Sequence, residues 1–487
     1  MITDATTLYA ALLARDRRFD GRFYVGVSST GIYCRPICRV RTPLAANCRF
    51  FAHAAAAEAA GFRPCLRCRP ELAPGLAAID ASSRLAWAAA QRIEAGQLDD
   101  DGLTGLAARL GIGERHLRRI FGETFGVTPV AYAQTQRRLL AKRLLADTNL
   151  TITEVALAAG FGSLRRFNTL FRSHYGLTPS ALRRESLPTN ASDGLQCELA
   201  YRPPFDWPRL LRFLAARCIA GVEEVDGECY RRSVALATAD GLYTGWIALR
   251  WSPQREAVVA SVAPSLARVL PAVLAGVRRL ADLCCEPQIV AAALGALAAD
   301  APGLRAPGAF DGFEMSVRAV VGQQVTVKAA HTLAGRFAAA FGAPIETPFA
   351  AIERLFPSAQ RVCALGVEEI AALGIVRQRA TAILALAREV ADGRLDLGPT
   401  ANIAATVAQL EALPGIGRWT AQYIALRALN WPDAWPSGDV ALIKSLGVAT
   451  ARAADTQAEA WRPWRSYATM HLWRRLAEGA ATMGGKT

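Results

Sequence analysis

The sequence has little that would place the protein in a membrane or outside the cell. Its longest uncharged apolar run, Ile289–Ala299, is well below the ~20 residues that a helix needs to cross a bilayer. The first residues, MITDATTLYA, lack the basic and then apolar segments of a secretory signal. Most of the 11 cysteines show no paired spacing, and Cys284, Cys285 and Cys363 lie in apolar helical surroundings where we expect core thiols. Reduced thiols and these absences predict a cytoplasmic protein.

Acidic residues are scarce relative to basic ones. The 487 residues carry a formal net charge of +14, and nearly all the positive charge is arginine. Arginine pairs with phosphate through two parallel hydrogen bonds and stacks on bases, which favours nucleic acid as the partner. A genome rich in G and C would also raise the arginine content, so charge alone leaves the partner open. The length predicts three or four domains, and a hydrophobic content of 52% suffices for several cores.

The chain divides by pattern into four predicted domains. Residues 1–75 are loop-rich and hold a cluster of cysteines, whereas residues 80–185 follow a helical pattern. Between residues 195 and 308, strand-like stretches alternate with helical ones, which predicts an α+β domain with an antiparallel sheet. Residues 309–487 have an all-helical pattern with short glycine and proline breaks. The fold class is therefore multidomain and mainly α, and residues 185–194 form a linker by composition.

Four cysteines near the start of the chain stand in a C-x3-C … C-x2-C arrangement. Zinc takes four thiolates in a tetrahedron, so the quartet predicts one zinc ion per chain in a small zinc-binding α/β domain. A purely structural zinc knuckle is the alternative that the spacing leaves open. The segment is also rich in arginine, which suits contact with DNA phosphate. The predicted ligands are Cys34, Cys38, Cys65 and Cys68, and the surrounding arginines are Arg35, Arg39, Arg41, Arg49, Arg63, Arg67 and Arg69.

The segments SSTGIYCRPICRVRTPLAANCRFF and AGFRPCLRCRPE resemble the N-terminal domain of the Ada family of methylphosphotriester repair proteins over its whole length. The resemblance implies that Cys34, the first cysteine, irreversibly takes a methyl group from a methylated DNA phosphate. It also implies DNA contacts from Arg41, Arg63 and Arg67. A zinc-bound thiolate stays deprotonated and nucleophilic, and its methylation would make the cluster less negative and tighten DNA binding. Cys48 is assigned no role.

The helical region contains an internal repeat, because the stretch from Phe121 to Pro129 recurs from Phe171 to Pro179. LTGLAARLGIGERHLRRIF and TITEVALAAGFGSLRRFNTLF resemble the two helix-turn-helix motifs of AraC-type regulators. Thr151 and Glu154 fit a capping box at the start of the second motif. A solvated basic helix face is the alternative for one motif alone. Arginine reads guanine and asparagine reads adenine, so two motifs in register favour base reading by Arg115, Arg118, Arg119, Arg165, Arg166 and Asn168.

The C-terminal region contains LPGIG, Leu413–Gly417, which fits the turn of a helix-hairpin-helix. Gly415 and Gly417 allow main-chain N–H groups to approach a DNA phosphate closely. Asp439 follows at the apparent start of a helix, where a plain N-cap is the alternative. A helix-hairpin-helix followed by an aspartate resembles a DNA glycosylase superfamily whose Schiff-base members carry a lysine where this chain has Trp419. The resemblance therefore implies monofunctional hydrolysis, with Asp439 stabilising the oxocarbenium-like sugar.

From about Leu199 to Ala477 the chain resembles the AlkA family of 3-methyladenine DNA glycosylases. The resemblance is carried by YRPPFDW, CEPQIVAAALG, APGLRAPGAFDGFEMSVRAVVGQQVTV, LPGIGRWTAQY and WRPWRSYATMHLW. By position, Trp419, Tyr423 and Trp473 would line a base pocket, where electron-rich rings attract positively charged alkylated purines. Gln324 stands where the family wedges an apolar residue into the gap left by the flipped base. No cysteine cluster follows, so we expect no iron–sulfur site.

Together the resemblances predict an Ada-type sensor and regulator fused to an AlkA-type glycosylase. The expected function is a response to DNA alkylation: stoichiometric methyl transfer to Cys34, methylation-switched transcription activation, and excision of bases such as 3-methyladenine. The Ada family's Pro-Cys-His-Arg methyltransferase has no counterpart in the sequence. The alternatives are a regulator with an inactive glycosylase domain, and an AraC-type sensor of a small molecule, for which no ligand-binding barrel is evident. The expected partners are double-stranded DNA, both alkylated sites and promoters, and RNA polymerase, with no membrane; we expect a monomer associated with the nucleoid.

Overall fold

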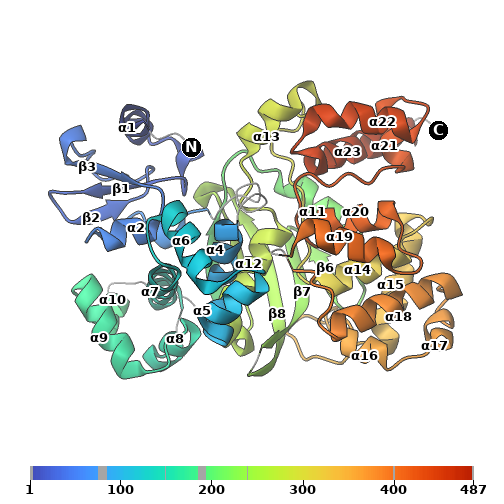
Figure 1. Ribbon diagram of the computed structural model, residues 1–487, viewed down its shortest axis with the longest axis horizontal. Helices are drawn as coiled ribbons and strands as arrows, with labels where there is room; N and C mark the ends of the chain where they lie inside the picture. Colours follow the sequence, from blue (N-terminus) through green and yellow to red (C-terminus); the bar gives the residue numbers. More distant parts are fainter. Residues whose placement is uncertain are drawn as a thin grey trace. The chain divides into compact units, whose positions relative to one another are not determined.

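The computed structural model describes residues 4–74, 85–148, 150–184, 194–238, 240–398 and 401–484. The chain splits into two compact units, of which the first comprises Met1–Pro203 with Leu236–Arg278 and the second Pro204–Ala235 with Arg279–Thr487. None of the described helices is both long and apolar enough to pass through a bilayer. Most of the predicted linker, residues 185–193, lies outside the described residues. The chain is mainly helical, as the sequence predicted (Figure 1).

The first unit begins with a small sheet of order β3-β1-β2-β4 (Figure 1). β1 pairs antiparallel with β2 and β3, whereas β2 pairs parallel with β4. Alternate residues of β1 point to opposite faces, so Val25 joins the core with Leu8 of α1, and Tyr24 joins the core with Ala57 of α2. The elements are α1 (Ala5–Leu13), η1 (Arg17–Phe19), β1 (Tyr24–Val27), β2 (Ile32–Cys34), η2 (Ala45–Asn47), β3 (Cys48–Phe51), α2 (Ala54–Ala59), β4 (Arg63–Pro64) and η3 (Pro70–Leu72).

The repeated sequence forms two helical subdomains whose corresponding helices end in the same way. α6 and α9 each stop at a glycine in the left-handed region, Gly126 with φ 70° and Gly176 with φ 71°, where glycine avoids a side-chain clash. The capping box is confirmed, because the Thr151 and Glu154 side chains bond each other's backbone N–H at the start of α8. The helices are α4 (Leu85–Glu94), α5 (Gln97–Arg109), α6 (Glu114–Phe125), α7 (Pro129–Asp147), α8 (Ile152–Ala158), α9 (Leu164–Tyr175) and α10 (Pro179–Arg184).

Buried ion pairs tie the long helix α7 to the N-terminal sheet region. Glu58 of α2 accepts hydrogen bonds from Arg138 at 2.6 Å and from Thr135 at 3.1 Å, both on α7. The Lys142 ammonium lies 2.7 Å from a Glu71 carboxylate oxygen and 3.4 Å from the carbonyl oxygen of Cys65. Burial alone would raise the pKa of Glu71, but the charges of Lys142 and Arg69 outweigh it and lower that pKa. The cysteine-bearing region and α7 are therefore held together by charge as well as by packing.

Five strands form a second sheet in the order β5-β9-β8-β7-β6. β9 pairs antiparallel with both β5 and β8, and β6 pairs antiparallel with β7, as expected for an α+β region. The elements here are β5 (Leu195–Ala200), α11 (Trp207–Ala215), β6 (Glu223–Asp226), β7 (Cys229–Thr238), β8 (Gly241–Ser252), η5 (Pro253–Arg255), β9 (Ala257–Val262), η6 (Pro264–Val269), α12 (Leu270–Leu280), α13 (Pro287–Leu294) and η7 (Gly295–Leu297).

The rest of the second unit is helical around one main core. That core joins Val317 and Val320 of α14, Ile383 of α18 and Ile424 of α20, all fully buried or nearly so. The other face of α20 packs through Leu426 with partly buried Trp473 of α23. The elements are α14 (Gly312–Val321), α15 (Val327–Phe341), α16 (Ala359–Cys363), α17 (Val367–Ala371), α18 (Arg377–Ala391), α19 (Ile403–Ala412), α20 (Arg418–Arg427), α21 (Val440–Leu446), α22 (Ala451–Ala458), η8 (Glu459–Trp461) and α23 (Arg465–Gly484).

We predict that Glu71→Gln destabilises the packing of α7. The substitution leaves the buried Lys142 ammonium without its carboxylate, and a stranded buried charge costs about 3–5 kcal/mol. The opening free energy of the α7 amides, measured by hydrogen exchange, should fall by about that amount.

Glu123→Gln is the matched control, because Glu123 pairs with Arg119 on the exposed face of α6. Exchange in this variant should stay close to that of the wild type, since exposed pairs contribute little. Equal exchange rates in the two variants would mean that the Glu71–Lys142 pair does not secure α7.

Candidate functional sites

The four predicted ligand cysteines come together at one end of the first sheet. Cys34 ends β2 and Cys65 directly follows β4, and the parallel pairing of these strands puts the two side by side. Cys38 and Cys68 lie in the turns that follow each strand. The four sulfur atoms lie within 4.8 Å of one another. Because a tetrahedron with Zn–S bonds of about 2.3 Å has edges of about 3.8 Å, the quartet fits a zinc ion.

The backbone and the guanidinium of Arg35 hydrogen-bond Cys68 and hold this part of the cluster in place. The N–H of Arg35 donates to the Cys68 sulfur at 3.3 Å, and its guanidinium donates to the Cys68 carbonyl at 3.1 Å. The same guanidinium pairs with the buried carboxylate of Asp20, with Nε 2.8 Å from Oδ1. Arg69 likewise pairs with Asp147 at 2.7 Å. These two arginines, which the sequence places among the basic residues around the cysteines, pair with carboxylates.

The other arginines around the cluster are exposed. Arg41 and Arg67 extend from the surface, as phosphate contacts would require. Arg63 is exposed too, but one of its nitrogens lies 3.5 Å from the carbonyl oxygen of Tyr175, the last residue of α9. Cys48 packs into the core beneath α1 and is not part of the four-cysteine group.

The two helix-turn-helix motifs present their predicted reading residues to solvent. α6 buries Leu117 and Phe121, and α9 buries the equivalent Phe167 and Phe171. One face of each helix therefore packs inside the subdomain. On the exposed face of α6, Arg118 pairs with Glu114 at 2.7 Å and Arg119 with Glu123 at 2.8 Å, and the hydrogen bond from Arg118 lowers the pKa of Glu114. The predicted reading residues Arg115, Arg118, Arg119, Arg165, Arg166 and Asn168 are all exposed.

The predicted hairpin connects α19 to α20 in the second unit. Gly415 has φ 78°, and a Cβ there would come within 3.1 Å of Ala382, so this position favours glycine twice over. Ile416 is buried and anchors the turn, while Gly417 is exposed at the N-terminus of α20. The carbonyl of Gly415 accepts a hydrogen bond from Gln323 at 2.9 Å. The backbone N–H groups of this turn are therefore held in a fixed position at the surface.

The Asp439 side chain caps the N-terminus of α21 and also accepts hydrogen bonds from two tryptophan side chains. Its Oδ1 accepts from the N–H groups of Ala441 at 2.9 Å and Leu442 at 3.0 Å, which begins α21. The indole of Trp419 donates to Oδ2 at 2.9 Å, and that of Trp473 donates to Oδ1 at 3.3 Å. The carboxylate is partly exposed. All four donors are neutral, so they orient the carboxylate without cancelling its charge.

The three predicted pocket aromatics lie together beside this carboxylate. The rings of Trp419 and Tyr423 are stacked, with centroids 5.3 Å apart and planes 11° from parallel. Trp473 lies against Tyr423 with centroids 6.0 Å apart. Burial alone would raise the pKa of Tyr423, but the positive charges of Arg427, Arg217 and Arg318 outweigh it and lower that pKa.

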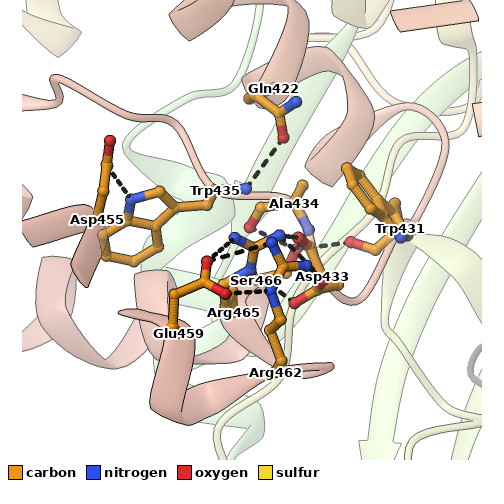
Figure 2. Close-up of polar contacts among 10 residues, drawn as sticks. All are labelled: Gln422, Trp431, Asp433, Ala434, Trp435, Asp455, Glu459, Arg462, Arg465 and Ser466. Atoms are coloured by element: carbon orange, nitrogen blue, oxygen red, sulfur yellow. Dashed lines mark hydrogen bonds and ion pairs between the residues drawn. The ribbon is translucent and has the colours of Figure 1, made fainter. Parts of the chain in front are cut away.

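Two carboxylates, of buried Asp433 and half-buried Asp455, bind the segment that precedes Asp439, and Figure 2 shows their contacts with Arg462, Arg465 and Trp435. Asp433 receives hydrogen bonds from Arg465 at 2.7 Å and from Arg462 at 2.6 Å. Asp455 accepts from the indole of Trp435 at 2.8 Å, and also from the hydroxyl of Ser437 at 2.8 Å. The sequence analysis did not predict these hydrogen bonds to Asp433 and Asp455. The run WPDAWPSGD, which alternates proline with hydrogen-bonding side chains, is a pattern typical of a loop held by side-chain hydrogen bonds.

The backbone of Gln324, the predicted wedge, is in an uncommon conformation. Gln324 is exposed and has φ 52° just beyond α14, a region that residues with a Cβ seldom occupy. Backbone conformations of this kind are found mostly at functional sites, where the surrounding structure holds them in place. The adjacent Gln323, which sequence reasoning did not single out, instead binds the hairpin through Gly415 and Thr420. The two glutamines of VVGQQVT thus have different surroundings.

Four family profiles match successive parts of the chain. They are the metal binding domain of Ada over residues 7–71, a helix-turn-helix domain over residues 106–185, the AlkA N-terminal domain over residues 196–311, and the HhH-GPD superfamily of base excision DNA repair proteins over residues 317–465. These matches and the geometry above define a DNA-repair and regulatory fusion protein that carries a zinc centre. The predicted domain boundaries themselves stay a prediction.

Among similar proteins, the Mycobacterium tuberculosis "Probable bifunctional transcriptional activator/DNA repair enzyme AlkA" is 39% identical over 98% of this chain and 97% of its own length. The chain therefore belongs to the family of bifunctional transcriptional activators and DNA repair enzymes that includes this relative. The "DNA-3-methyladenine glycosylase 2" of Escherichia coli is 38% identical over 56% of this chain and 95% of its own. A solved 3-methyladenine DNA glycosylase from Archaeoglobus fulgidus covers 58% of this chain and 98% of its own, with a TM-score of 0.50 and 18% identity, which shows a shared fold alone.

We predict that Cys65→Ser lowers the zinc content of the purified protein from one ion per chain toward zero. Loss of one of four thiolates breaks the closed tetrahedral site, and structural zinc contributes directly to folding free energy. Metal analysis checks the zinc content, and hydrogen exchange should show faster opening of β2 and β4.

Cys48→Ser is the matched control, because Cys48 lies in the same small domain but outside the four-sulfur group. It should retain a full complement of zinc. Zinc loss in Cys48→Ser, or full retention in Cys65→Ser, would contradict the ligand assignment.

Proposed function

We propose that this chain repairs alkylated DNA in two ways and activates transcription in response to one of them. It transfers a methyl group from a methylphosphotriester to Cys34, and it hydrolyses the N-glycosidic bond of alkylated bases such as 3-methyladenine. The observation that carries the proposal is the Asp439 carboxylate, oriented by two indoles and two amides beside a stack of aromatic rings. The names of its relatives support the same assignment.

In base excision, the aromatic side chains Trp419, Tyr423 and Trp473 receive a flipped base, and electron-rich rings favour the cationic alkylated purines. The C1′–N bond breaks and its electron pair stays on the departing base. The Asp439 carboxylate stabilises the positive charge that develops on the sugar and takes a proton from the attacking water. Neutral donors on Asp439 suit this role, because they leave the negative charge available. Trp419 occupies the position of the Schiff-base lysine, so the reaction is monofunctional.

DNA contact in this half comes from the hairpin and from Gln324. The exposed backbone at Gly415 and Gly417 suits a phosphate, because no side chain blocks the N–H groups. Gln324 is exposed and held in a left-handed backbone conformation, which supports its role as the wedge that fills the gap left by the flipped base. An inactive glycosylase domain is not favoured, because Asp439, both indoles and the hairpin are present together.

In methyl transfer, the Cys34 sulfur attacks the methyl carbon of the phosphotriester. The carbon–oxygen bond breaks with its electron pair on the phosphate, and a neutral thioether remains on the protein. Zinc, when bound by the quartet, keeps the thiolate deprotonated and nucleophilic. Arg41, Arg63 and Arg67 are exposed around the cluster, where they can hold the DNA backbone. Because the thioether is stable, each chain reacts once.

Transcription activation follows from the charge lost at the cluster and from the two helix-turn-helix motifs. Methylation makes the cluster less negative, so DNA phosphates are repelled less. The exposed residues of α6 and α9 then read promoter bases in the major groove. The chain acts as a monomer in the cytoplasm near the nucleoid and contacts RNA polymerase. The boundaries of its four domains follow those that the sequence predicts.

We predict that Cys34→Ser abolishes methyl transfer and promoter activation, because a serine hydroxyl is not ionised at neutral pH and cannot act as the nucleophile. Incubation with methylphosphotriester DNA and mass mapping of the peptides checks this. In the wild type the added methyl should lie on Cys34 alone. A methyl on Cys38, Cys65 or Cys68 would contradict the assignment, and base excision by Cys34→Ser should be normal.

We predict that Asp439→Asn lowers excision of 3-methyladenine by ~10²–10⁴-fold, the scale of losing a positioned catalytic group. Asparagine is as good an N-cap as aspartate and keeps one oxygen for the N–H groups of Ala441 and Leu442, so α21 should form normally. Its NH2 cannot accept from the Trp419 indole, so the free energy of unfolding should fall by about 1 kcal/mol, the scale of one lost hydrogen bond. Release of free base from alkylated DNA measures the effect. The matched control is Asp392→Asn, an exposed carboxylate paired with Arg394.

Wild-type excision by Asp439→Asn would reduce this residue to a helix cap. A covalent adduct trapped by borohydride in the wild type would contradict the monofunctional mechanism. Methylation of Cys34 should proceed normally in Asp439→Asn, because the two chemistries use different residues.

A further inference from the structure

The segment that connects α14 to α15 is joined to the hairpin by one side chain. Residues 322–326, which we call the wedge segment, link the two helices, and Gln324 at their centre is exposed. The neighbouring Gln323 is half-buried. Its amide nitrogen donates to the carbonyl oxygen of Gly415 at 2.9 Å and to the hydroxyl oxygen of Thr420 at 2.9 Å. Gln323 therefore ties the wedge segment to the helix-hairpin-helix.

Both hydrogen bonds need the amide NH2 group of Gln323. A side-chain amide carries two N–H donors, and the carbonyl of Gly415 can only accept. The NH2 group therefore faces the hairpin, and both of its hydrogens are used there. Thr420 is 3% exposed, so water competes little for its hydroxyl. A side chain of the same length without N–H donors would form neither bond.

The two acceptors belong to parts of the hairpin with different proposed roles. Gly415 lies in the exposed turn whose N–H groups suit a DNA phosphate. Thr420 lies in the first turn of α20, directly after Trp419, whose indole donates to Asp439 at 2.9 Å. Among the described residues, these two hydrogen bonds are the ones that join residues 322–326 to the hairpin and α20. The wedge segment is thus linked to the phosphate-binding turn and to the helix that orients the carboxylate.

We infer that Gln323 is a positioning residue that holds the wedge side chain of Gln324 at a fixed distance from the hairpin, and that this link serves base flipping rather than bond cleavage. The inference rests on the proposed base excision and on the DNA contacts proposed for Gln324 and the hairpin. When the hairpin binds a phosphate, a rigid link brings the wedge to a defined base step of the same duplex. A wedge on a loosened segment enters that step less often, so the flipped state is less populated.

The inference distinguishes two substrates that differ only in how firmly the lesion is held in the duplex. Flipping a paired base requires unpairing and unstacking, whereas a lesion with no base opposite it is extruded more easily. A loosened wedge therefore slows excision of a paired lesion and affects an unpaired one little. Damage to the fold, or to the chemistry at Asp439, would slow excision from both substrates alike.

The test compares the full-length wild type with Gln323→Met, which keeps the length of the side chain and removes both N–H donors. The substrates are two duplexes that each contain one 7-methylguanine, opposite either cytosine or an abasic-site analogue. In Gln323→Met, kcat/KM for the paired lesion should fall about tenfold or more, the scale of two lost hydrogen bonds, and that for the unpaired lesion should change less than about twofold. Gln324→Ala, which removes the wedge itself, should give the same pattern.

Unstacking gives a second readout, which does not depend on catalysis. A fluorescent base analogue placed beside the lesion brightens when the neighbouring base leaves the stack. With the paired lesion, the rise in fluorescence on binding should be smaller in Gln323→Met than in the wild type. With the unpaired lesion, the two proteins should give the same rise.

Thr420→Val tests the same link from the other side, even if Gln323→Met does not fold. It removes one acceptor and keeps a side chain of similar size, so excision of the paired lesion should again fall more than that of the unpaired one. The double variant should lose little more than Gln323→Met alone, because both substitutions break the same contact. Gln409→Met is the matched control, because Gln409 is an exposed glutamine of α19 that donates to the carbonyl of Arg394 at 3.3 Å, and it should leave both rates unchanged.

Equal loss on both substrates, or an unchanged rate for the paired lesion in Gln323→Met or in Gln324→Ala, would overturn the inference while leaving the proposed glycosylase intact. Fully additive losses in the double variant would overturn the contact between Gln323 and Thr420 as the link. Excision of neither lesion by the wild type would instead remove the proposed base-excision function, and the inference with it.

Discussion

The structure depends on one constraint, that a carboxylate taken out of water must find a positive partner. Desolvating an unpaired carboxylate costs several kcal/mol, and arginine side chains repeatedly offset this cost by forming ion pairs. Glu58 pairs with Arg138, and Asp433 pairs with Arg465 and Arg462. In the second unit, two buried glutamates and two arginines form one network: Glu223, Glu314, Arg232 and Arg318. Many of the arginines that make the composition basic are thus internal.

Asp439 departs from this pattern, and the departure suits the catalytic role that we propose for it. The structure places four neutral donors on its carboxylate, from two indoles and two backbone amides. Neutral donors fix the direction of the carboxylate and leave its charge to act on a developing cation. The strong ion pairs lie at Asp433, earlier in the same loop, where they hold it in place (Figure 2). Asp433 therefore supports the loop, while the charge of Asp439 is not cancelled by an ion pair.

Sequence patterns predicted much of the architecture. The alternation of strand-like and helical stretches expected between residues 195 and 308 is present, with strands β5 to β9 and helices α11 to α13. Cys285 is a buried thiol as expected, whereas Cys284 and Cys363 are half-buried. Strand β6 was missed, because the acidic sequence EEVD has no alternating apolar pattern. Its Glu223 is buried because it pairs with Arg232, its register partner on β7, and with Arg318 of α14, which is far away along the chain and which no local pattern reports.

The sequence by itself determined the cysteine quartet, the LPGIG turn and the repeated helix ends, because each is a local feature whose geometry follows from a few neighbouring residues. Only the tertiary structure decided which arginines near the cysteines are exposed and which pair with carboxylates in the interior. Arg35 and Arg69 look like Arg41 in the sequence, yet they are bound to Asp20 and Asp147. It also decided that the Asp439 carboxylate accepts hydrogen bonds from the indoles of Trp419, on α20, and Trp473, on α23. A side chain's role there depends on partners that are far away along the chain, and folding alone brings those partners within hydrogen-bond distance.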